Sequence, residues 1–404
     1  MALDTYEPTD DVLESSWALM NGDRGSWLPD EVKSAARAAS VTDATPQLLI
    51  DPQGALQTAN ELRQLLGEVR YAVKAGPYAP IVEALAKAGH GFDVASSAET
   101  ELVVSCGGKC ETVLCSNPAM SPREVRAVLG LGVRWFVTDS IEHSAQIVEQ
   151  AAVLGIAPGD IELLVRLSLK DPSARITLSE KFGVPTNEAE GIVADARNRG
   201  LKVRGLSFHL GSQAGSKNAA AAASRTTLAL VRRLGIKDPV IDVGGGFAAP
   251  YVGAPDWRKF AEGFAEPLRD SEVEVLCEPG RVVATSGTWL VATVIAVSTR
   301  NKTRFIHLDA GAYHGLMEMS SLSTHPFMLP MAFGGPGATG DFVAGRMVGP
   351  TCDSLDTLFG GDVPVPTGLS VGDTVVFGHA GAYSITCSSP FNGFAVPNVG
   401  VVSA

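Results

Sequence analysis

The sequence contains no long apolar segment and no basic stretch that would direct it to a membrane or a nucleic acid. No apolar run approaches the roughly 18 residues of a membrane span. Acidic residues outnumber basic ones by 44 to 32, and the resulting net charge of −12 argues against a polyanion as partner. The first residues lack the basic start and apolar centre of a signal peptide. We therefore expect a cytoplasmic protein with neither a membrane nor a nucleic-acid partner.

Cysteine is also scarce, with six residues scattered over a chain of 404. Cys106, Cys110 and Cys115 form a loose group, but no histidine or second close pair completes a zinc site. The sequence therefore predicts reduced thiols and no metal site.

Short apolar strands alternate with amphipathic helices from residue 70 to residue 277. Repeated strand–helix units imply parallel pairing, and eight units fit a closed (β/α)8 barrel of about 250 residues. An open, doubly wound sheet is the alternative. We place the barrel domain at residues 45–285. The predicted strands cover residues 71–74, 92–94, 112–115, 135–138, 161–167, 203–208, 240–243 and 273–277.

The alternation stops near residue 285, and a mostly-β domain is predicted beyond it. The expected strands cover residues 289–298, 305–308, 374–377 and 383–386, with glycine- and proline-rich turns between them. Before the barrel, residues 1–44 are polar and weakly patterned. Two short helices are predicted there, over residues 11–20 and 28–39, and a strand follows at residues 48–50.

Polar residues and glycines gather at the ends of the predicted barrel strands, where parallel barrels carry their chemistry. Taken singly, each has a structural explanation as a cap, an ion pair, a buried histidine or a tight turn. Together they place several reactive side chains on one rim. The residues are Lys74, Asp93, Arg166, His209, Gly244 to Gly246, Glu278 and Arg281.

These residue types suit one cofactor chemistry. A lysine amine can join covalently to an aldehyde cofactor. A glycine-rich turn and an arginine can hold a phosphate. A glutamate can keep a pyridine nitrogen protonated, and a histidine can stack on the ring. This combination predicts pyridoxal 5'-phosphate as the cofactor.

At this point the chain resembles a known family, the fold-type III pyridoxal-phosphate decarboxylases, which include the ornithine, lysine and diaminopimelate decarboxylases. Matching motifs occur over most of the chain in the family's order. They are Tyr71-Ala72-Val73-Lys74, Gly91 to Ser96, Ser207 to Gln213, Asp242 to Phe247, Glu278-Pro279-Gly280-Arg281, Gly349 to Asp356, Gly381-Ala382-Tyr383 and Phe391 to Phe394.

The resemblance implies a role for each matched position. Lys74 would hold the cofactor, Glu278 would face the pyridine nitrogen and His209 would stack on the ring. Asp93 and Arg166 would support the cofactor and the lysine. Cys352 would protonate Cα once CO2 has left. The phosphate would be bound by Ser212, Gly245, Gly246, Arg281 and Tyr383.

The resemblance also implies an architecture and an assembly. Residues 1–44 would join residues 286–404 in the β domain. Two chains would form a head-to-tail homodimer with shared active sites, in which Cys352 and Asp353 come from the partner chain. The expected function is decarboxylation of an L-amino acid to an amine and CO2, as in polyamine synthesis.

The chain departs from the family where the substrate side chain is held. Asp309-Ala310-Gly311-Ala312-Tyr313 matches the motif that precedes this segment, and Tyr313, Leu322 and Asp353 are the substrate-binding candidates. Ornithine-type enzymes carry a Tyr-Asp pair where this chain has Ser321 and Leu322. An unpaired second ammonium group in a closed site would cost several kcal/mol. We therefore expect a substrate other than ornithine, unless Glu318 or Asp353 replaces the missing acid.

Three alternatives remain at the level of sequence. One is a plain ornithine or lysine decarboxylase. Another is an amino-acid racemase of the same fold, although racemases lack the Cys352 motif and use a second base. The third is a non-catalytic regulatory homologue, against which the retained Lys74, Glu278, Arg281 and Cys352 argue.

Overall fold

The computed structural model describes residues 27–323 and 327–403, and these form two compact units. One unit comprises Leu56–Ala248 and Pro255–Val283, and the other comprises the described parts of Met1–Ala55, Ala249–Ala254 and Ala284–Ala404. The helix expected at residues 11–20 lies outside the described residues. The first unit is called the barrel unit below, and the second is called the β unit.

Eight parallel strands close the barrel unit in sequence order. Closure decides against the open, doubly wound sheet. The last strand pairs with the first through Glu68 opposite Leu276 and Val69 opposite Cys277. The strands are β2 (Glu68–Ala72), β3 (Gly91–Val94), β4 (Val113–Cys115), β5 (Trp135–Thr138), β6 (Glu162–Leu167), β7 (Lys202–Phe208), β8 (Val240–Asp242) and β9 (Glu274–Cys277).

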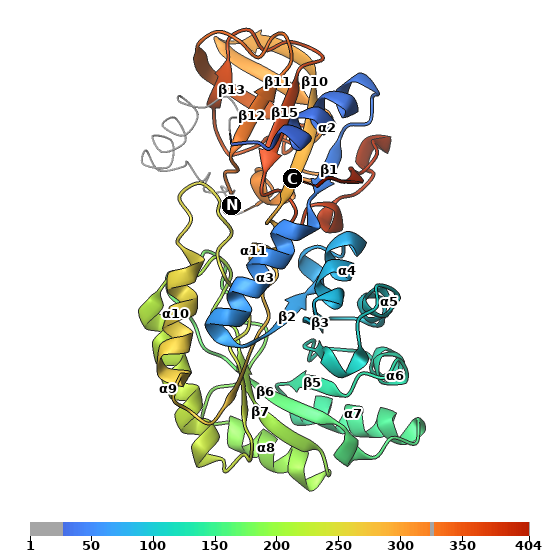
Figure 1. The fold of residues 1–404 in the computed structure, drawn as a ribbon, viewed down its shortest axis with the longest axis vertical. Coiled ribbons are helices and arrows are strands. Elements are labelled where there is room, and N and C mark those ends of the chain that lie inside the picture. Colours follow the sequence, from blue (N-terminus) through green and yellow to red (C-terminus); the bar gives the residue numbers. More distant parts are fainter. Residues whose placement is uncertain (1–26, 324–326, 404) are drawn as a thin grey trace. The chain divides into compact units, whose positions relative to one another are not determined.

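Helices cover the outside of the strand ring, as Figure 1 shows for α4 to α10. They leave the strand ends clear because each begins only after a loop that follows a strand. The helices are α3 (Pro52–Leu66), α4 (Ala79–Lys87), α5 (Ser97–Ser105), α6 (Pro122–Gly130), α7 (Ile141–Val153), α8 (Ala189–Asn198), α9 (Lys217–Arg233), α10 (Trp257–Leu268) and the short α11 (Arg281–Ala284).

Apolar side chains on the strands account for the barrel's stability. Leu114, Val137, Leu164, Val240 and Leu276 form a buried cluster to which five strands contribute. Outside the ring, Phe247 packs edge-on against Phe260 and Phe264 of α10, with ring centroids 5.8 and 6.1 Å away. Phe247 directly follows the glycine triplet, so this packing fixes that loop on the barrel.

The β unit is built on one long strand, β10 (Thr288–Arg300). Its first half pairs with β1 (Gln47–Ile50) and β15 (Thr374–Gly378), and its second half pairs with β11 (Thr303–Leu308) after a register shift between Val294 and Ala296. The remaining strands are β12 (Met331–Gly334), β13 (Phe342–Val348), β14 (Val363–Pro366) and β16 (Asn398–Val401).

One helix, α2 (Asp30–Val41), covers a face of this sheet (Figure 1). Its buried Val32 and Ala36 pack with Leu49, Trp289 and Val376. The predicted barrel range of 45–285 begins earlier than the barrel unit, because β1 pairs with β10 and β16 in the β unit's sheet.

The strand predicted at residues 383–386 is wrong. Tyr383 has a φ of 53°, which no β-strand accommodates, and a 3₁₀ turn follows over Ile385–Cys387. The strand predicted at residues 71–74 ends early, at Ala72.

Candidate active site

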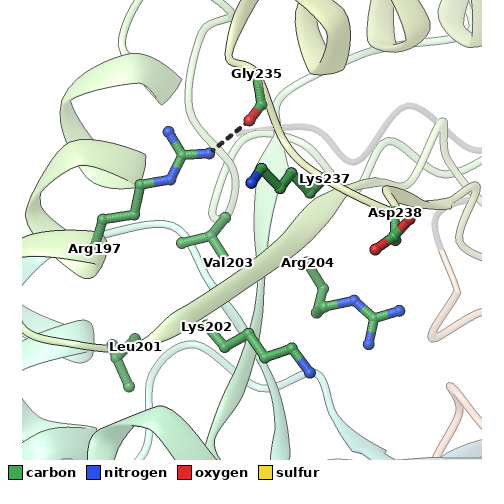
Figure 2. A pocket seen from close by; sticks show the side chains of 8 residues that line it. All are labelled: Arg197, Leu201, Lys202, Val203, Arg204, Gly235, Lys237 and Asp238. Atoms are coloured by element: carbon green, nitrogen blue, oxygen red, sulfur yellow. Dashed lines mark hydrogen bonds between the residues drawn. The ribbon is translucent and has the colours of Figure 1, made fainter.

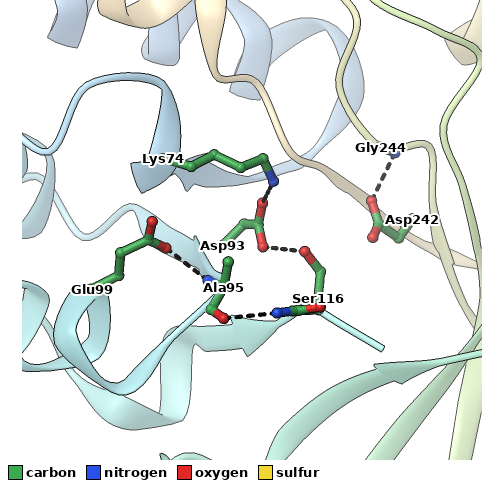
Figure 3. Close-up of polar contacts among 8 residues, drawn as sticks. Lys74, Asp93, Ala95, Glu99, Ser116, Asp242 and Gly244 are labelled. Carbon is green, nitrogen blue, oxygen red and sulfur yellow. Dashed lines mark hydrogen bonds and ion pairs between the residues drawn. The ribbon is translucent and has the colours of Figure 1, made fainter. Parts of the chain in front are cut away.

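Lys74 lies in a 3₁₀ turn, Val73–Ala75, directly after the first barrel strand. The Tyr71 hydroxyl donates to the Gly76 carbonyl at 2.8 Å and so holds the turn against the strand end. The Lys74 Nζ donates to Asp93 Oδ2 at 2.8 Å (Figure 3). The Lys74 side chain is 47% exposed, whereas the Asp93 side chain is fully buried. The amine is therefore presented at the barrel rim while its counter-ion is fixed within the barrel wall.

Asp93 is itself oriented by a neighbour that the sequence did not indicate. The Ser116 hydroxyl, directly after β4, donates to Asp93 Oδ1 (Figure 3). Each Asp93 oxygen thus has one donor, and the carboxylate cannot rotate away from Lys74 without losing both.

We expect Asp93→Asn to lower turnover by about tenfold, because a neutral acceptor replaces a charge-assisted hydrogen bond to Lys74. Steady-state kinetics would measure kcat and KM separately. Asp139→Asn, a carboxylate bound to the Gly183 N–H at 2.8 Å on the same unit, is the matched control. An unchanged kcat in Asp93→Asn would contradict the role given to Asp93.

His209 follows β7 as a neutral imidazole of one tautomer. The Gly211 N–H donates to Nδ1 at 3.1 Å, so Nδ1 is the acceptor and Nε2 carries the hydrogen. Burial, together with the charges of Arg166 and Lys74, lowers the pKa of His209 to about 3. Arg166, near the end of β6, lies over the Phe182 ring at 5.5 Å. The ring of His209 is therefore uncharged at neutral pH and free of competing proton chemistry.

The glycine triplet after β8 makes a cradle that side chains would fill. A Cβ on Gly245 would lie 3.2 Å from His209 Nε2, and a Cβ on Gly246 would lie 2.1 Å from the Gly211 carbonyl oxygen. Gly244 and Gly246 also have φ values of 69° and 94°. Glycine is thus required where backbone N–H groups turn toward the rim.

Arg281 and Ser212 meet beside this cradle. Arg281 Nε donates to Ser212 Oγ at 3.4 Å, and Arg281 is only 6% exposed. A guanidinium next to a hydroxyl and a glycine-rich turn suits an anion such as phosphate.

Glu278, directly after β9, brings an unsatisfied carboxyl oxygen to the same rim. Its Oε1 is inaccessible to solvent and has no hydrogen-bond donor within reach. Burial and the nearby Asp242 and Asp93 carboxylates raise the pKa of Glu278. A buried oxygen of this kind calls for a donor from a bound molecule.

The other predicted site residues belong to the β unit, where two of them meet. The Tyr313 hydroxyl donates to Asp353 Oδ2 at 2.5 Å, and the Tyr313 ring stacks on Phe391 with centroids 4.5 Å apart. Cys352 is exposed, and its thiol donates to Asn392 Oδ1 at 3.4 Å. Asn392 also accepts from the Cys352 N–H at 3.2 Å, so one amide holds both ends of the cysteine.

Leu322 is 39% exposed and lies in a segment joined to the Cys352 loop. The neighbouring Ser321 N–H donates to the Thr357 carbonyl at 2.8 Å. The position that would carry an acid in ornithine-type enzymes is therefore an apolar, solvent-facing side chain. Tyr383 belongs to the same unit and is partly exposed.

A cavity of about 540 Å³ lies at the opposite ends of the barrel strands from the rim (Figure 2). It is lined by the start of β7 and the loop before β8. Two of its cations, Lys202 and Arg204, both bind Glu162 at 2.7 Å. Arg197 donates to the Leu234 and Gly235 carbonyls. We therefore place no reaction chemistry in this cavity.

No group of three histidine, cysteine, aspartate or glutamate side chains within residues 27–323 and 327–403 could hold a metal ion. Across the same residues, no helix combines the length and apolar character that crossing a bilayer requires.

The comparison with protein families decides the identity. The family model described as "pyridoxal-dependent decarboxylase, pyridoxal binding domain" matches residues 55–285, more than half of the chain. This chain belongs to the pyridoxal-dependent decarboxylases. The decarboxylase uses pyridoxal phosphate as its cofactor and an amino acid as its substrate.

Two named decarboxylases and one protein of another name are similar to this chain. The decarboxylase is 31% identical over 337 residues to a lysine/ornithine decarboxylase of Selenomonas ruminantium, covering 81% of each chain. The crystal structure of a Vibrio vulnificus lysine/ornithine decarboxylase with cadaverine matches with a TM-score of 0.82 and 27% identity, covering 93% of this chain and 100% of that one. Antizyme inhibitor 2 of Xenopus laevis is 29% identical over 345 residues, covering 80% and 73%.

Independently of the family match, the residues at the barrel rim suit a bound pyridoxal phosphate. The unsatisfied Glu278 oxygen suits the ring nitrogen, the glycine cradle with Arg281 suits the phosphate, and Lys74 suits the aldehyde. Sequence reasoning missed Ser116, and it gave no individual role to Asn392 or Asp242, although both lie in matched motifs. Ser116 had the same signal as the others, a polar residue directly after a barrel strand.

Proposed function

We propose that the decarboxylase holds its cofactor with the rim residues of the barrel unit. Lys74 provides the covalent link, and Asp93 and Arg166 orient it. Glu278 faces the ring nitrogen, and His209 stacks on the ring. The phosphate is bound by Ser212, Gly245, Gly246 and Arg281 of the barrel unit, and Tyr383 of the β unit is a further proposed phosphate ligand. The observation that carries this proposal is the Lys74 amine, fixed at 2.8 Å from the buried Asp93 at the carboxyl end of the barrel.

Pyridoxal phosphate, when bound, supplies an electron sink for the bond that breaks at Cα. The protein's part is to orient and to manage protons. A neutral His209 can cover one ring face without adding a charge there. Glu278 offers a negative oxygen at the ring nitrogen, where positive charge must be kept.

Cys352 is the proposed proton donor to the substrate's Cα. Its exposed thiol is available to solvent for reloading, and Asn392 fixes the direction of its S–H. The neighbouring Asp353 and Tyr313 are linked by their hydrogen bond and form one wall of the proposed substrate side-chain pocket. Leu322 is assigned to the same pocket because of its position after the matched motif.

We further propose a homodimer in which Cys352 and Asp353 complete the partner's site. Exposed apolar side chains near Cys352 support this assembly. Leu355, Phe391 and Phe394 are each about 40% exposed, with values of 43%, 40% and 43%. Covering such side chains is a driving force for association. The six free cysteines support the cytoplasm as its compartment.

The side chain of the proposed substrate has no terminal ammonium group at the distance from Cα at which ornithine carries one. Steady-state CO2 release across ornithine, lysine, arginine, diaminopimelate and aliphatic amino acids tests this. We expect ornithine not to give the highest kcat/KM. A clear ornithine preference would refute the proposal. An assay of stereoinversion with the same substrates distinguishes racemase activity from decarboxylation.

We expect Leu322→Asp to raise kcat/KM for ornithine relative to the best wild-type substrate by at least about tenfold, since a hydrogen bond to a charged group is worth about 1.5–3 kcal/mol once the proposed partner chain covers this exposed position. Leu322→Asn is the matched control, with similar shape and no charge. Equal ornithine preference in both variants would show that the negative charge at this position does not select the substrate.

A further inference from the structure

Asp242, the last residue of β8, is a buried carboxyl beside the proposed cofactor site to which the sequence motif gives no role. Asp242 is fully buried. Its Oδ1 accepts from the Gly244 N–H at 2.9 Å (Figure 3). Its Oδ2 is buried and has no N–H or O–H donor within reach. One oxygen of this carboxyl therefore has a hydrogen-bond donor in the glycine turn, and the other oxygen has none.

The backbone brings Asp242 and Glu278 to the same side of the barrel wall. Asp242 pairs with Leu276 in the β8–β9 register, and Glu278 stands two residues after Leu276, on the same face of the chain. Gly244 ties the two segments together, because its carbonyl accepts from the Glu278 N–H at 2.8 Å. Each side chain brings one solvent-inaccessible oxygen without a donor to this stretch of the wall, so a hydrogen bond between the two carboxyls would satisfy both.

A hydrogen bond between two carboxyls requires a proton on one of them. The donor-free Asp242 Oδ2 and Glu278 Oε1 are the two oxygens available for it. Two ionised carboxylates in contact in a buried site repel each other strongly, so the pair retains one proton. With the cofactor bound, Asp242 is the better carrier, because a positive charge at the proposed place of the ring nitrogen favours Glu278 as the carboxylate.

We propose that Asp242 is a positioning residue that keeps a proton on Oδ2 and donates it in a hydrogen bond to Glu278, which stays a carboxylate directed at the cofactor's ring nitrogen. This inference rests on the proposed role of Glu278. No bond breaks, and the proton stays on Asp242. The other charged or titratable groups around the pair come from β2, the Lys74 turn, β3, β6 and β9, and are Arg70, Lys74, Asp93, Arg166 and Cys277.

The pair has a consequence for stability that needs no cofactor. Burial, and after it the Asp93 carboxylate, raise the pKa of Asp242 to about 7. An unfolded aspartate releases its proton near pH 4, at about 3.9. Between these values the folded chain holds a proton that the unfolded chain has lost, so stability falls as the pH rises through this window.

The first test compares melting temperatures of the full-length, cofactor-free protein at pH 5.5 and pH 8. Asp242→Asn keeps a donor for Glu278 and an acceptor for Gly244, but it cannot titrate. We expect a smaller loss of melting temperature with rising pH in Asp242→Asn than in the wild type. Asp171→Asn is the control, since Asp171 is buried and accepts only from the Ser173 and Ser216 N–H groups. If the melting temperature of Asp242→Asn falls with pH as much as that of the wild type, the proposal that the pair shares a proton is overturned.

The second test measures the dissociation constant of pyridoxal phosphate by absorbance. We expect Asp242→Leu, which has no donor, to bind about tenfold more weakly than Asp242→Asn. Equal affinities would overturn the positioning role. If Asp242→Leu does not fold, the dissociation constants of the wild type and Asp242→Asn are measured from pH 7 to pH 9 instead. The quantity compared is the wild-type value divided by the Asp242→Asn value. That ratio should rise with pH, and a constant ratio would overturn the role.

Glu278→Gln separates this inference from the proposed function beneath it. A cofactor affinity unchanged in Glu278→Gln would reject the role of Glu278, and the positioning role of Asp242 with it. A weaker affinity in Glu278→Gln together with equal affinities of Asp242→Leu and Asp242→Asn would reject the role of Asp242 alone.

Discussion

Replacing Lys74 with alanine should lower decarboxylation by at least about a thousandfold, equivalent to about 4 kcal/mol of transition-state stabilisation. Lys74 is the amine that the structure presents at the barrel rim, 2.8 Å from the buried Asp93. In the proposed site, its loss would leave the cofactor with no covalent link to the chain and no amine to exchange with the substrate. CO2 release measures the loss, and absorbance near the visible edge measures the covalently held cofactor.

Two further variants identify the cause of that loss. Lys74→Arg keeps a cation for Asp93 but no nucleophilic amine, so it should be as inactive as Lys74→Ala. Lys87→Ala removes an exposed lysine from α4 of the same unit and should behave as the wild type. Substantial activity in Lys74→Arg would show that the positive charge, rather than the amine, is what the reaction needs.

Cys352→Ala should lower kcat by about a hundredfold to ten-thousandfold, the usual contribution of a positioned proton donor. KM should change little, because the thiol acts on Cα and not on substrate binding. Cys352→Ser keeps a donor hydrogen-bonded to Asn392, and its kcat should lie between those of the wild type and Cys352→Ala. Amine formation measures the effect. Cys387→Ala, another exposed cysteine of the β unit, is the control. An unchanged kcat in Cys352→Ala would assign the proton to another group.

Mixing Lys74→Ala with Cys352→Ala tests the shared site directly. If each site takes Lys74 from one chain and Cys352 from the other, random exchange should restore about a quarter of wild-type activity. Sites built from a single chain would recover nothing on mixing, and this result would contradict the proposed dimer.

The barrel was predictable from sequence because its signals are local. Each strand–helix unit carries its own apolar pattern, and the rim residues follow the strands one by one. The exact course of the chain at Lys74 was not predictable, because the strand ends at Ala72 through a hydrogen bond from Tyr71 to Gly76. Ser116 and Asp242 act through residues on neighbouring strands, and such partners are visible only once the barrel closes.

The β unit was harder to predict for a related reason. Its strands pair across long sequence separations and are interrupted by turns with positive φ, such as Tyr383 at 53°. The strand at residues 48–50 was found, but nothing in its pattern shows that it pairs with β10 and β16 rather than with the barrel.

The position of β1 sets an order for folding during synthesis. β1 lies between β10 and β16 and pairs in parallel with β16, from Gln47 opposite Asn398 to Ile50 opposite Val401. The Val402 N–H also donates to the Ile50 carbonyl at 2.9 Å. Domains generally fold as units while the chain is made, and the barrel unit is finished at Val283. The β1 strand is made before the barrel unit, and it must wait for residues 398–401, which are made after that unit, before its second edge is covered.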